Sequence, residues 1–218
     1  MKIDILTLFP EMFSAVFEYS IIGRAQKENY VSINIHQLRN WADGKYQKVD
    51  DRPFGGGVGM LLKIEPIHKA IKSLNSNQNA RVILTDAGGE IFTQKKAQKL
   101  CKEKHLIFIC GRYEGVDHRV HEHIADEILS IGEFVLTGGE IPTMIMVDTI
   151  VRLIPGVLRK EEAVLYESFS ESKDQTILTE YPQYTRPEIY NNWKVPEILL
   201  SGDHKKIAEW RNLKSKKT

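Results

Sequence analysis

The stretch Leu106-Ile107-Phe108-Ile109-Cys110-Gly111 decides the fold class of this chain. Five consecutive apolar residues are the length of a strand that is buried on both faces, and glycine follows at once. The run Arg81-Val82-Ile83-Leu84-Thr85 precedes this stretch and Glu133-Phe134-Val135-Leu136-Thr137 follows it, and we expect both to form strands of the same kind. Buried strands that alternate with helical stretches predict an α/β fold with a parallel sheet.

Two further strands and three helices follow from the apolar pattern elsewhere. Residues 3–9 and 31–38 carry aliphatic residues at strand spacing, and we expect both to form strands. Proline opens residues 10–23, where it suits the first turn of a helix that we expect to end at a glycine. Apolar residues recur at helical spacing over residues 64–74, and residues 141–154 are apolar on nearly every side, as in a buried helix.

Glycines follow each of the three central strands. They are Gly88 and Gly89 after the first strand, Gly111 and Gly115 after the second, and Gly138 and Gly139 after the third. In an open parallel sheet the ligand lies beyond the carboxyl ends of the strands, where glycine lets the backbone approach it closely. The end of a strand explains any one of these glycine pairs, but three in succession favour a single ligand pocket.

The glycine-rich stretch Gly55-Gly56-Gly57-Val58-Gly59-Met60 argues against two common kinds of phosphate-binding site. It lacks the last glycine of the dinucleotide motif, and no P-loop motif occurs in the chain. An adenosine-type ligand without a polyphosphate therefore remains open, and S-adenosylmethionine is one such ligand. The whole loop, residues 39–60, is long for a compact domain, and its aromatic residues Trp41, Tyr46 and Phe54 argue for function over disorder.

Length and composition exclude several classes of protein. With 218 residues and 42% hydrophobic content the chain can bury the core of one domain and has room for a small second one. Cys101 and Cys110 form no Cys-x-x-Cys motif, so we expect two reduced thiols. The longest apolar run, residues 141–154, is too short to span a bilayer, and the N-terminus does not resemble a secretory signal. We expect a cytoplasmic protein with no membrane partner.

Two groups of polar residues are candidates for a functional site. Asp148 and Arg152 are the charged residues of the apolar run, and an intrahelical ion pair worth about 0.2–0.5 kcal/mol would explain them. The charge of an arginine on a buried helix nevertheless needs an anionic or polar partner, which makes Arg152 a candidate site residue. His118, His121 and His123 lack metal-ligand spacing, and we expect them to be solvated helix residues.

The charge and composition of the chain change twice along residues 161–218. Residues 161–183 carry six acidic residues and one basic residue, which predicts a flexible acidic linker. A small helical region follows from residue 184, with Asp203 as the expected cap of its last helix. Residues 202–218 carry six basic and two acidic residues, which suits contacts with phosphates. The net charge of +1 therefore results from opposing segments, and it does not argue against nucleic acid as a partner.

Six motifs in order resemble the bacterial tRNA (guanine-37-N1)-methyltransferases of the SPOUT class. They lie at residues 49–60, 110–117, 130–136, 138–140, 152–158 and 184–188. The resemblance implies a SPOUT-type parallel sheet with a deep C-terminal trefoil knot, followed by a small helical domain. It also implies a homodimer with an active site shared between the subunits. The implied domains are a methyltransferase domain at residues 1–160, the linker at 161–183, and a tRNA-binding domain at 184–218 that is shorter than usual for the family.

The resemblance also assigns ligands and residues. S-adenosylmethionine is the implied methyl donor, and the substrate is tRNA with guanosine at position 37 and another guanosine before it. Mg²⁺ assists the reaction, with ligands that the motifs do not identify. The implied donor-binding residues are Thr85, Gly88, Gly111, Tyr113, Glu114, Ile131, Gly132, Glu133, Phe134, Val135, Leu136, Gly138 and Gly139. The implied substrate-binding residues are Asp50, Arg52, Gly55, Gly57, Gly59 and Arg186.

The chemistry explains the two catalytic residues that the resemblance assigns. The N1 atom of guanine carries a proton at neutral pH, so a carboxylate base must remove it, and the charge that develops toward O6 needs a cation. Arg152 matches the arginine of the family. Glu167 stands where the family pattern has aspartate and keeps the carboxylate with one more methylene; Glu171 and Asp174 are the next candidates for the base.

Two other functions are alternatives to the methyltransferase. A SPOUT-class RNA-binding relative, weakened in catalysis by the change at Glu167, is one, and the retained donor-pocket motifs argue against it. An unrelated nucleotide-dependent oxidoreductase is the other, and the missing dinucleotide glycines argue against it.

Overall fold

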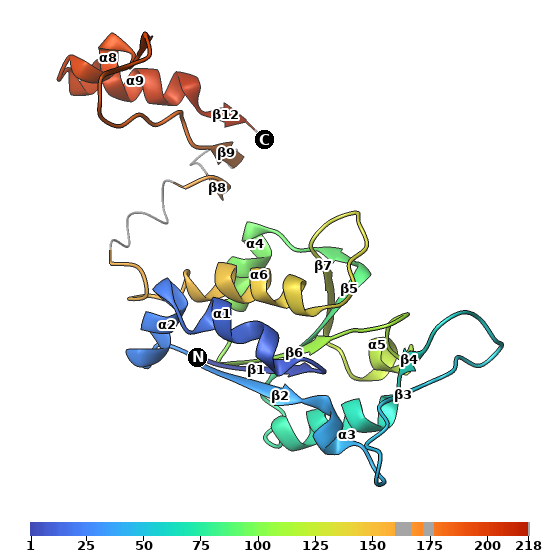
Figure 1. Ribbon diagram of the computed structural model, residues 1–218. Coiled ribbons are helices and arrows are strands. Elements are labelled where there is room, and N and C mark those ends of the chain that lie inside the picture. Colours follow the sequence, from blue (N-terminus) through green and yellow to red (C-terminus); the bar gives the residue numbers. More distant parts are fainter. Residues whose placement is uncertain (160–166, 172–176, 218) are drawn as a thin grey trace. The chain divides into compact units, whose positions relative to one another are not determined.

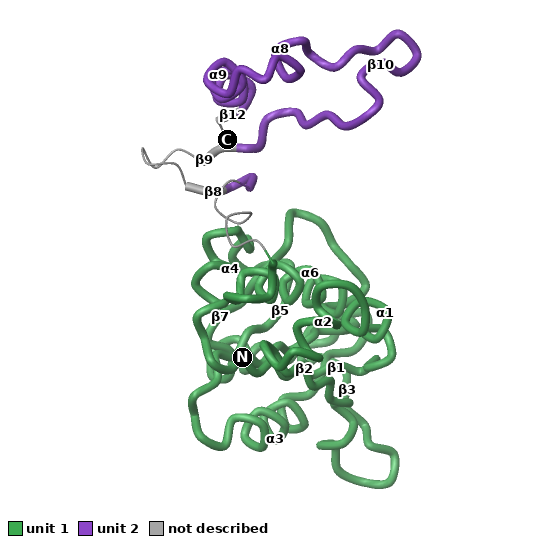
Figure 2. Tube along the Cα trace, turned by 90° about the vertical axis from the view of Figure 1, so that its left-hand side faces the viewer, with its two compact units in different colours: residues 1–159 green, residues 160–218 purple. Residues whose placement is uncertain are grey.

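A computed structural model describes residues 1–159, 167–171 and 177–217 of the chain. The chain divides into two compact units, Met1–Arg159 and Lys160–Thr218, which Figure 2 shows in different colours. Each unit is described by itself below.

The first unit contains a five-stranded parallel sheet, as the sequence predicts. The strand order is β2-β1-β6-β5-β7, and every neighbouring pair is parallel. The strands are β1 (Lys2–Thr7), β2 (Ser32–Gln37), β5 (Arg81–Ile91), β6 (His105–Cys110) and β7 (Glu127–Ser130). The stretch that decided the fold class, β6, lies at the centre between β1 and β5, where four of its residues are less than 2% exposed.

The prediction of a strand at residues 133–137 is wrong. The fifth strand is β7, six residues earlier, and residues 133–137 form an irregular loop. Phe134, Val135 and Leu136 are exposed in that loop, to 53%, 87% and 39%. This apolar run is therefore not a buried strand. The exposure of its side chains is explained by the pocket that they line.

The helix predicted at residues 10–23 is divided into three short pieces. They are η1 (Pro10–Phe13), α1 (Ser14–Phe17) and α2 (Ser20–Lys27). Gly23 lies inside α2 and does not end it. A Cβ atom on Gly23 would lie 2.3 Å from the carbonyl oxygen of Glu18, so glycine serves close packing at this position.

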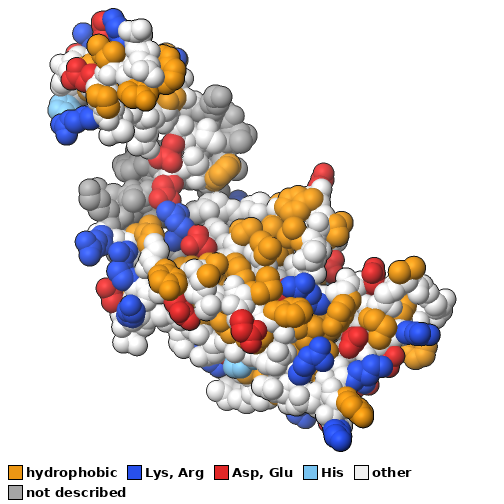
Figure 3. Space-filling model, in the orientation of Figure 1, with side chains coloured by type: hydrophobic (Ala, Val, Ile, Leu, Met, Phe, Trp, Pro, Cys, Tyr) orange, Lys and Arg blue, Asp and Glu red, His pale blue; other side chains and the backbone are white. Residues whose placement is uncertain are grey.

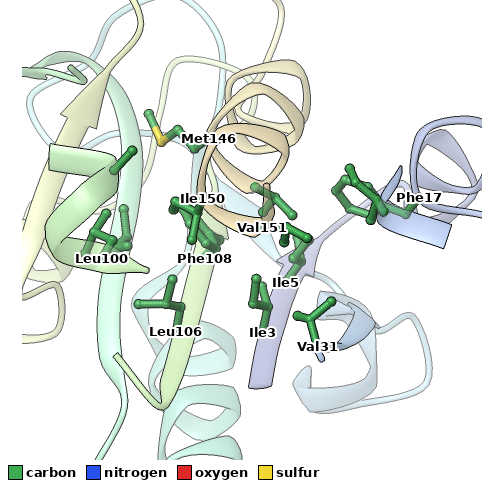
Figure 4. Packing of buried hydrophobic residues seen from close by; sticks show 14 of the residues in the cluster. Ile3, Ile5, Phe17, Val31, Leu100, Leu106, Phe108, Met146, Ile150 and Val151 are labelled. Atoms are coloured by element: carbon green, nitrogen blue, oxygen red, sulfur yellow. The ribbon is translucent and has the colours of Figure 1, made fainter. Parts of the chain in front are cut away.

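Helices cover both faces of the sheet, as Figure 1 shows. On one face α2, α4 (Gln94–Leu100) and α6 (Glu140–Val151) pack on alternate residues of the strands. In Figure 4, Met146, Ile150 and Val151 of α6 lie beside residues of β1 and β6. On the other face α3 (Ile64–Leu74), which has the bounds predicted, and α5 (Arg119–His123) complete a second core.

The expectation that the helix near residues 141–154 is buried all round is wrong. The helix α6 buries Met146, Val147, Ile150 and Val151 against the sheet, but its first turns present an outer face. Ile141 and Ile145 lie one turn apart on that face and are 46% and 45% exposed. Among the described residues no helix is both long enough and apolar enough to cross a membrane.

The second unit contains more strand than predicted. β8 (Ser170–Glu171), β9 (Ile177–Thr179) and β12 (Lys216–Lys217) form a small antiparallel sheet, and β10 (Ile189–Tyr190) pairs with β11 (Trp193–Lys194). β8 and β9 lie within the predicted linker, residues 161–183, of which 161–166 and 172–176 are outside the described residues and include Asp174. Two helices follow, α8 (Glu197–Leu200) and α9 (His204–Lys214). Asp203 caps α9 as predicted, because its side chain accepts a hydrogen bond from the backbone N–H of Lys206.

Candidate functional site

The loops that follow β6 and β7 converge on one pocket with residues 85–87 of β5, at the point where the register of β5 against β7 shifts. Its lining comes from residues 85–87, 111–115, 129–131, 134–139 and 142. Fifty-four residues separate Thr85 from Gly139, yet the Thr85 hydroxyl lies 3.3 Å from the Gly139 carbonyl oxygen, to which it donates. The parallel arrangement of the strands therefore produces the composite pocket that the glycines predicted.

Glycine is required where the walls of this pocket meet. The backbone N–H of Gly139 donates to the carbonyl oxygen of Gly111 over 2.8 Å. A Cβ atom on Gly139 would lie 2.1 Å from the Thr85 Oγ1 and 2.8 Å from the Gly111 nitrogen. Gly111 is less crowded, because a Cβ atom there would meet its nearest neighbour, the Thr85 carbonyl oxygen, at 3.5 Å.

Most residues predicted to bind a methyl donor lie in this pocket. Those that line it are Thr85, Gly111, Tyr113, Glu114, Ile131, Phe134, Val135, Leu136, Gly138 and Gly139. Gly88, Gly132 and Glu133 do not line it. Gly88 lies within β5, which continues along β7 and ends six residues after the predicted end at Thr85.

Several lining residues were not among those predicted. Asp86 and Arg112 are the charged ones, and Ser130 and Thr137 are polar. Asp86 and Arg112 each follow a predicted strand or its glycine directly in the sequence, so a charged residue at the carboxyl end of a buried strand was the signal that could have identified them.

The prediction that His118, His121 and His123 are solvated is wrong for His121. Its side chain is 17% exposed, and its Nε2 atom lies 3.3 Å from an oxygen of Asp86 in the pocket wall. Its Nδ1 atom is buried without a hydrogen-bond partner among the described residues. His118 and His123 are 78% and 69% exposed, as predicted, and the ring of His118 stacks on that of His121.

Burial keeps the thiol of the cysteine beside the pocket protonated. Cys110 ends β6, is 2% exposed, and lies 3.3 Å from the Thr143 hydroxyl through its sulfur. Burial, followed by the neighbouring carboxylate of Glu140, raises the pKa of the Cys110 thiol far above its ordinary value. Cys110 is therefore a neutral thiol without nucleophilic character, and Cys101 is also unpaired, as predicted for both.

The glycine-rich loop is attached to the same pocket. β3 (Asp50–Asp51) and β4 (Leu61–Leu62) pair at its base, and the predicted substrate residues Asp50, Arg52, Gly55, Gly57 and Gly59 lie in β3 and the loop between these strands. The backbone N–H of Glu114 donates to the carbonyl oxygen of Met60, and that of Leu62 donates to Gly115. The three predicted glycines have φ values of +82°, +130° and +84°, which other residues rarely adopt.

The two predicted catalytic residues lie in different units. Arg152 directly follows α6 in the first unit, and its backbone N–H donates to the carbonyl oxygen of Asp148. Glu167 is half-buried in the second unit, which also contains Arg186.

Comparisons with known proteins agree on one family. A family model described as tRNA (Guanine-1)-methyltransferase TrmD matches residues 1–218. A Bacillus subtilis (strain 168) protein named tRNA (guanine-N(1)-)-methyltransferase is 52% identical over 99% of this chain and 87% of its own length. Proteins of the same name from Staphylococcus epidermidis and Geobacillus kaustophilus are each 50% identical, over 97% and 99% of this chain and 84% and 86% of their own lengths. The resemblance carried by the six motifs is confirmed, and this chain belongs to the tRNA (guanine-1)-methyltransferase TrmD family.

Proposed function

We propose that this protein transfers a methyl group from S-adenosylmethionine to N1 of guanosine 37 in tRNAs that carry a guanosine before it. The observation that carries the proposal is the pocket where Thr85, Gly111 and Gly139 meet, in a chain whose relatives are named for methylation of guanine N1 in tRNA. The specific nucleotide at position 37 and the guanosine before it come from the resemblance.

The chemistry of the pocket lining supports S-adenosylmethionine as its ligand. Backbone at Gly138 and Gly139 lets a flat base approach closely, and the exposed side chains of Phe134 and Leu136 offer it an apolar surface. Asp86 and Glu114 supply carboxylates that accept hydrogen bonds from ribose hydroxyls or pair with a cationic group. This ligand also explains why the apolar residues of the 133–137 loop are exposed in the chain alone.

Glu167 and Arg152 would act on the guanine. S-adenosylmethionine supplies a methyl group that its sulfonium makes electrophilic. The carboxylate of Glu167 takes the N1 proton, and the freed N1 electron pair forms the new bond to carbon while the bond from carbon to sulfur breaks. Arg152 stabilises the negative charge that develops on O6 during this step. Arg186 and the loop with Asp50 and Arg52 would hold the RNA.

Mg²⁺ is the second group that the resemblance implies. Within the residues that the structure describes, no three His, Cys, Asp or Glu side chains lie together as metal ligands would. Mg²⁺ commonly keeps several waters and combines one or two carboxylates with phosphate oxygens of a substrate. The described side chains therefore do not identify the ligands of this ion, and we assign none.

The surface of the first unit supports the proposed homodimer. Figure 3 shows hydrophobic side chains gathered over η1, α1 and α6. They include Phe9, Met12, Val16, Ile141 and Ile145, which are 38–46% exposed. A second copy would cover this face and bring its own Glu167 as the shared catalytic group. The trefoil knot, the tRNA-binding role of residues 184–218 and a cytoplasmic location, where the tRNA substrate is processed, complete the proposal.

Methyl transfer to transcribed tRNAs tests the proposal. We expect product with guanosine at position 37 and none with adenosine there, and a lower rate when the preceding guanosine is replaced. Product with adenosine and none with guanosine would contradict the substrate assignment. Binding of S-adenosylmethionine and tRNA without any product would instead indicate the weakened RNA-binding relative.

A further inference from the structure

A buried carboxylate behind the pocket has no part in the chemistry above. Glu140 is the first residue of α6 and is 1% exposed, yet it does not line the pocket. Its Oε1 accepts a hydrogen bond from the Thr7 hydroxyl over 2.7 Å, and its Oε2 accepts one from Nε of Arg112 over 2.9 Å. The N-terminus of α6 also favours its negative charge.

These contacts join three segments that are distant in the sequence. Thr7 ends β1, Arg112 follows β6, and Glu140 begins α6. Arg112 extends the chain of contacts into the pocket wall, since its Nη1 donates to the carbonyl oxygen of Thr137 over 3.1 Å. The guanidinium also lies over the ring of Phe9, 4.5 Å from its centroid. A single carboxylate therefore connects the sheet to the loop that carries Phe134, Val135 and Leu136.

Gly138 shows how closely the ion pair and the pocket wall are fitted together. A Cβ atom on Gly138 would lie 2.4 Å from Nε of Arg112 and 2.7 Å from Oε2 of Glu140. Its φ is not in the left-handed region, so the ion pair and not backbone conformation excludes a side chain here. The glycine that lines the pocket thus lies directly against the Arg112–Glu140 pair.

We propose that Glu140 is a positioning residue for the methyl donor. Burying an ion pair stabilises a fold less than packing apolar side chains of similar volume, so stability alone does not account for this pair. The pair instead fixes an orientation, because the planar guanidinium of Arg112 holds the Thr137 carbonyl in one position relative to Gly111 and Gly138. The 134–139 wall is thereby held in the shape that receives the donor. This inference rests on the proposed function for the identity of the ligand.

Glu140→Gln tests the inference, because an amide cannot accept hydrogen bonds from both Thr7 and Arg112 through two oxygens. We expect the dissociation constant of S-adenosylhomocysteine, measured by calorimetry on the full chain, to rise at least about tenfold. The KM for S-adenosylmethionine should rise equally, while the KM for tRNA and the kcat at saturating donor stay within about twofold. Thr7→Val is the matched control: it removes a hydrogen bond to the other oxygen of the same carboxylate from a residue that does not line the pocket, and donor affinity should stay within about twofold.

Gly138→Ala provides a second measurement if Glu140→Gln folds poorly. Its added methyl group displaces Arg112, so it should weaken donor binding to a similar degree. In the double variant the two losses should be less than additive, because both break one contact. Wild-type affinity in Glu140→Gln, equal loss in Thr7→Val, or full additivity would each overturn the inference. A wild-type protein that neither binds S-adenosylhomocysteine nor methylates tRNA would instead contradict the proposed function.

Discussion

At position 167 the chain carries glutamate where the resemblance implies aspartate as the base. The extra methylene moves the carboxylate by roughly 1 Å, and a displacement of that size can cost about a hundredfold in rate unless the segment adjusts. We expect Glu167→Gln to lower kcat for methyl transfer more than about a hundredfold, because an amide cannot take the N1 proton. Single-turnover methylation of a guanosine-37 tRNA measures this.

Two variants control that experiment. Glu167→Asp keeps a carboxylate and should stay within about tenfold of wild type. Glu171→Gln alters the next acidic residue along the chain and should leave the rate unchanged. If Glu167→Gln methylates as fast as wild type, Glu167 is not the base, and the Glu171 variant then reports on the next candidate.

Asp4 of β1 gives a prediction about acid stability. Its side chain is 1% exposed and accepts hydrogen bonds from His36, Lys2, His105 and Asn34. Burial alone would raise the pKa of Asp4, but these partners outweigh it and hold the pKa far below the ordinary value of an aspartate. A folded-state pKa below that of the unfolded chain adds stability above about pH 4, and this stability is lost as the pH falls further.

Asp4→Asn should therefore destabilise the protein by about 3 kcal/mol at pH 7, since it removes a buried carboxylate that accepts hydrogen bonds from several side chains. Urea unfolding measures this, and the difference from wild type should shrink as the pH falls below 4. Asp43→Asn is the control, because Asp43 pairs with Lys69 at the surface and its side chain is 84% exposed. A difference that does not change with pH would show that Asp4 contributes through its shape and not its charge.

Among the elements, α6 depends on the glycine before its first residue. Gly139 has φ −82°, which any residue adopts, so only crowding by Thr85, Gly111 and Cys110 excludes a side chain there. We expect Gly139→Ala to lower stability by about 1–3 kcal/mol through overpacking and to weaken donor binding. Thermal unfolding and calorimetry with S-adenosylhomocysteine measure the two effects.

Gly111→Ala is the matched control for Gly139→Ala. Its Cβ atom would make ordinary contacts at 3.5 Å and 3.9 Å, so the fold should keep its stability. Because Gly111 also lines the pocket, a loss of donor affinity in a stable Gly111→Ala protein would show that the donor approaches this backbone closely. Equal destabilisation by both substitutions would contradict the crowding argument.

Elements in which apolar residues recur with one clear period were predictable from the sequence, whereas apolar loops were not. The helix at residues 64–74 and the strand at 106–110 were correct because burial there follows the local pattern. The run at 133–137 has the composition of a buried strand, and local pattern cannot separate a strand from a loop whose apolar side chains face a pocket. The short strand β7 has only two apolar residues of four, so its pairing with β5 was not visible in the sequence.

The candidate site was predictable to a similar extent and for related reasons. The glycines after three strands indicated a pocket, and the motifs identified ten residues that line it. Asp86 and the Arg112–Glu140 pair were missed because their roles depend on contacts between β1, β6 and α6, which no local pattern contains.

For the whole molecule, the exposed face of η1, α1 and α6 is the feature that the isolated chain leaves unexplained. Ile141 and Ile145 lie on α6, and Phe9, Met12 and Val16 lie in or just before η1 and α1. A stable dimer interface buries about 800 Å² on each partner and has an apolar centre. Five partly exposed apolar side chains on adjacent elements have the character of such a centre, which is why we place the second copy on this face.

Ile145→Glu tests that placement, because a charge at the centre of an apolar interface would be buried without a partner. We expect the variant to sediment as a monomer in analytical ultracentrifugation while the wild type sediments as a dimer. Methyl transfer should fall more than about tenfold, since the partner's Glu167 is then absent. Ile91→Glu is the matched control, because Ile91 is also 45% exposed but ends β5 and does not belong to η1, α1 or α6, and that variant should remain a dimer. A dimeric Ile145→Glu protein with full activity would place the interface, and with it the shared site, elsewhere on the chain.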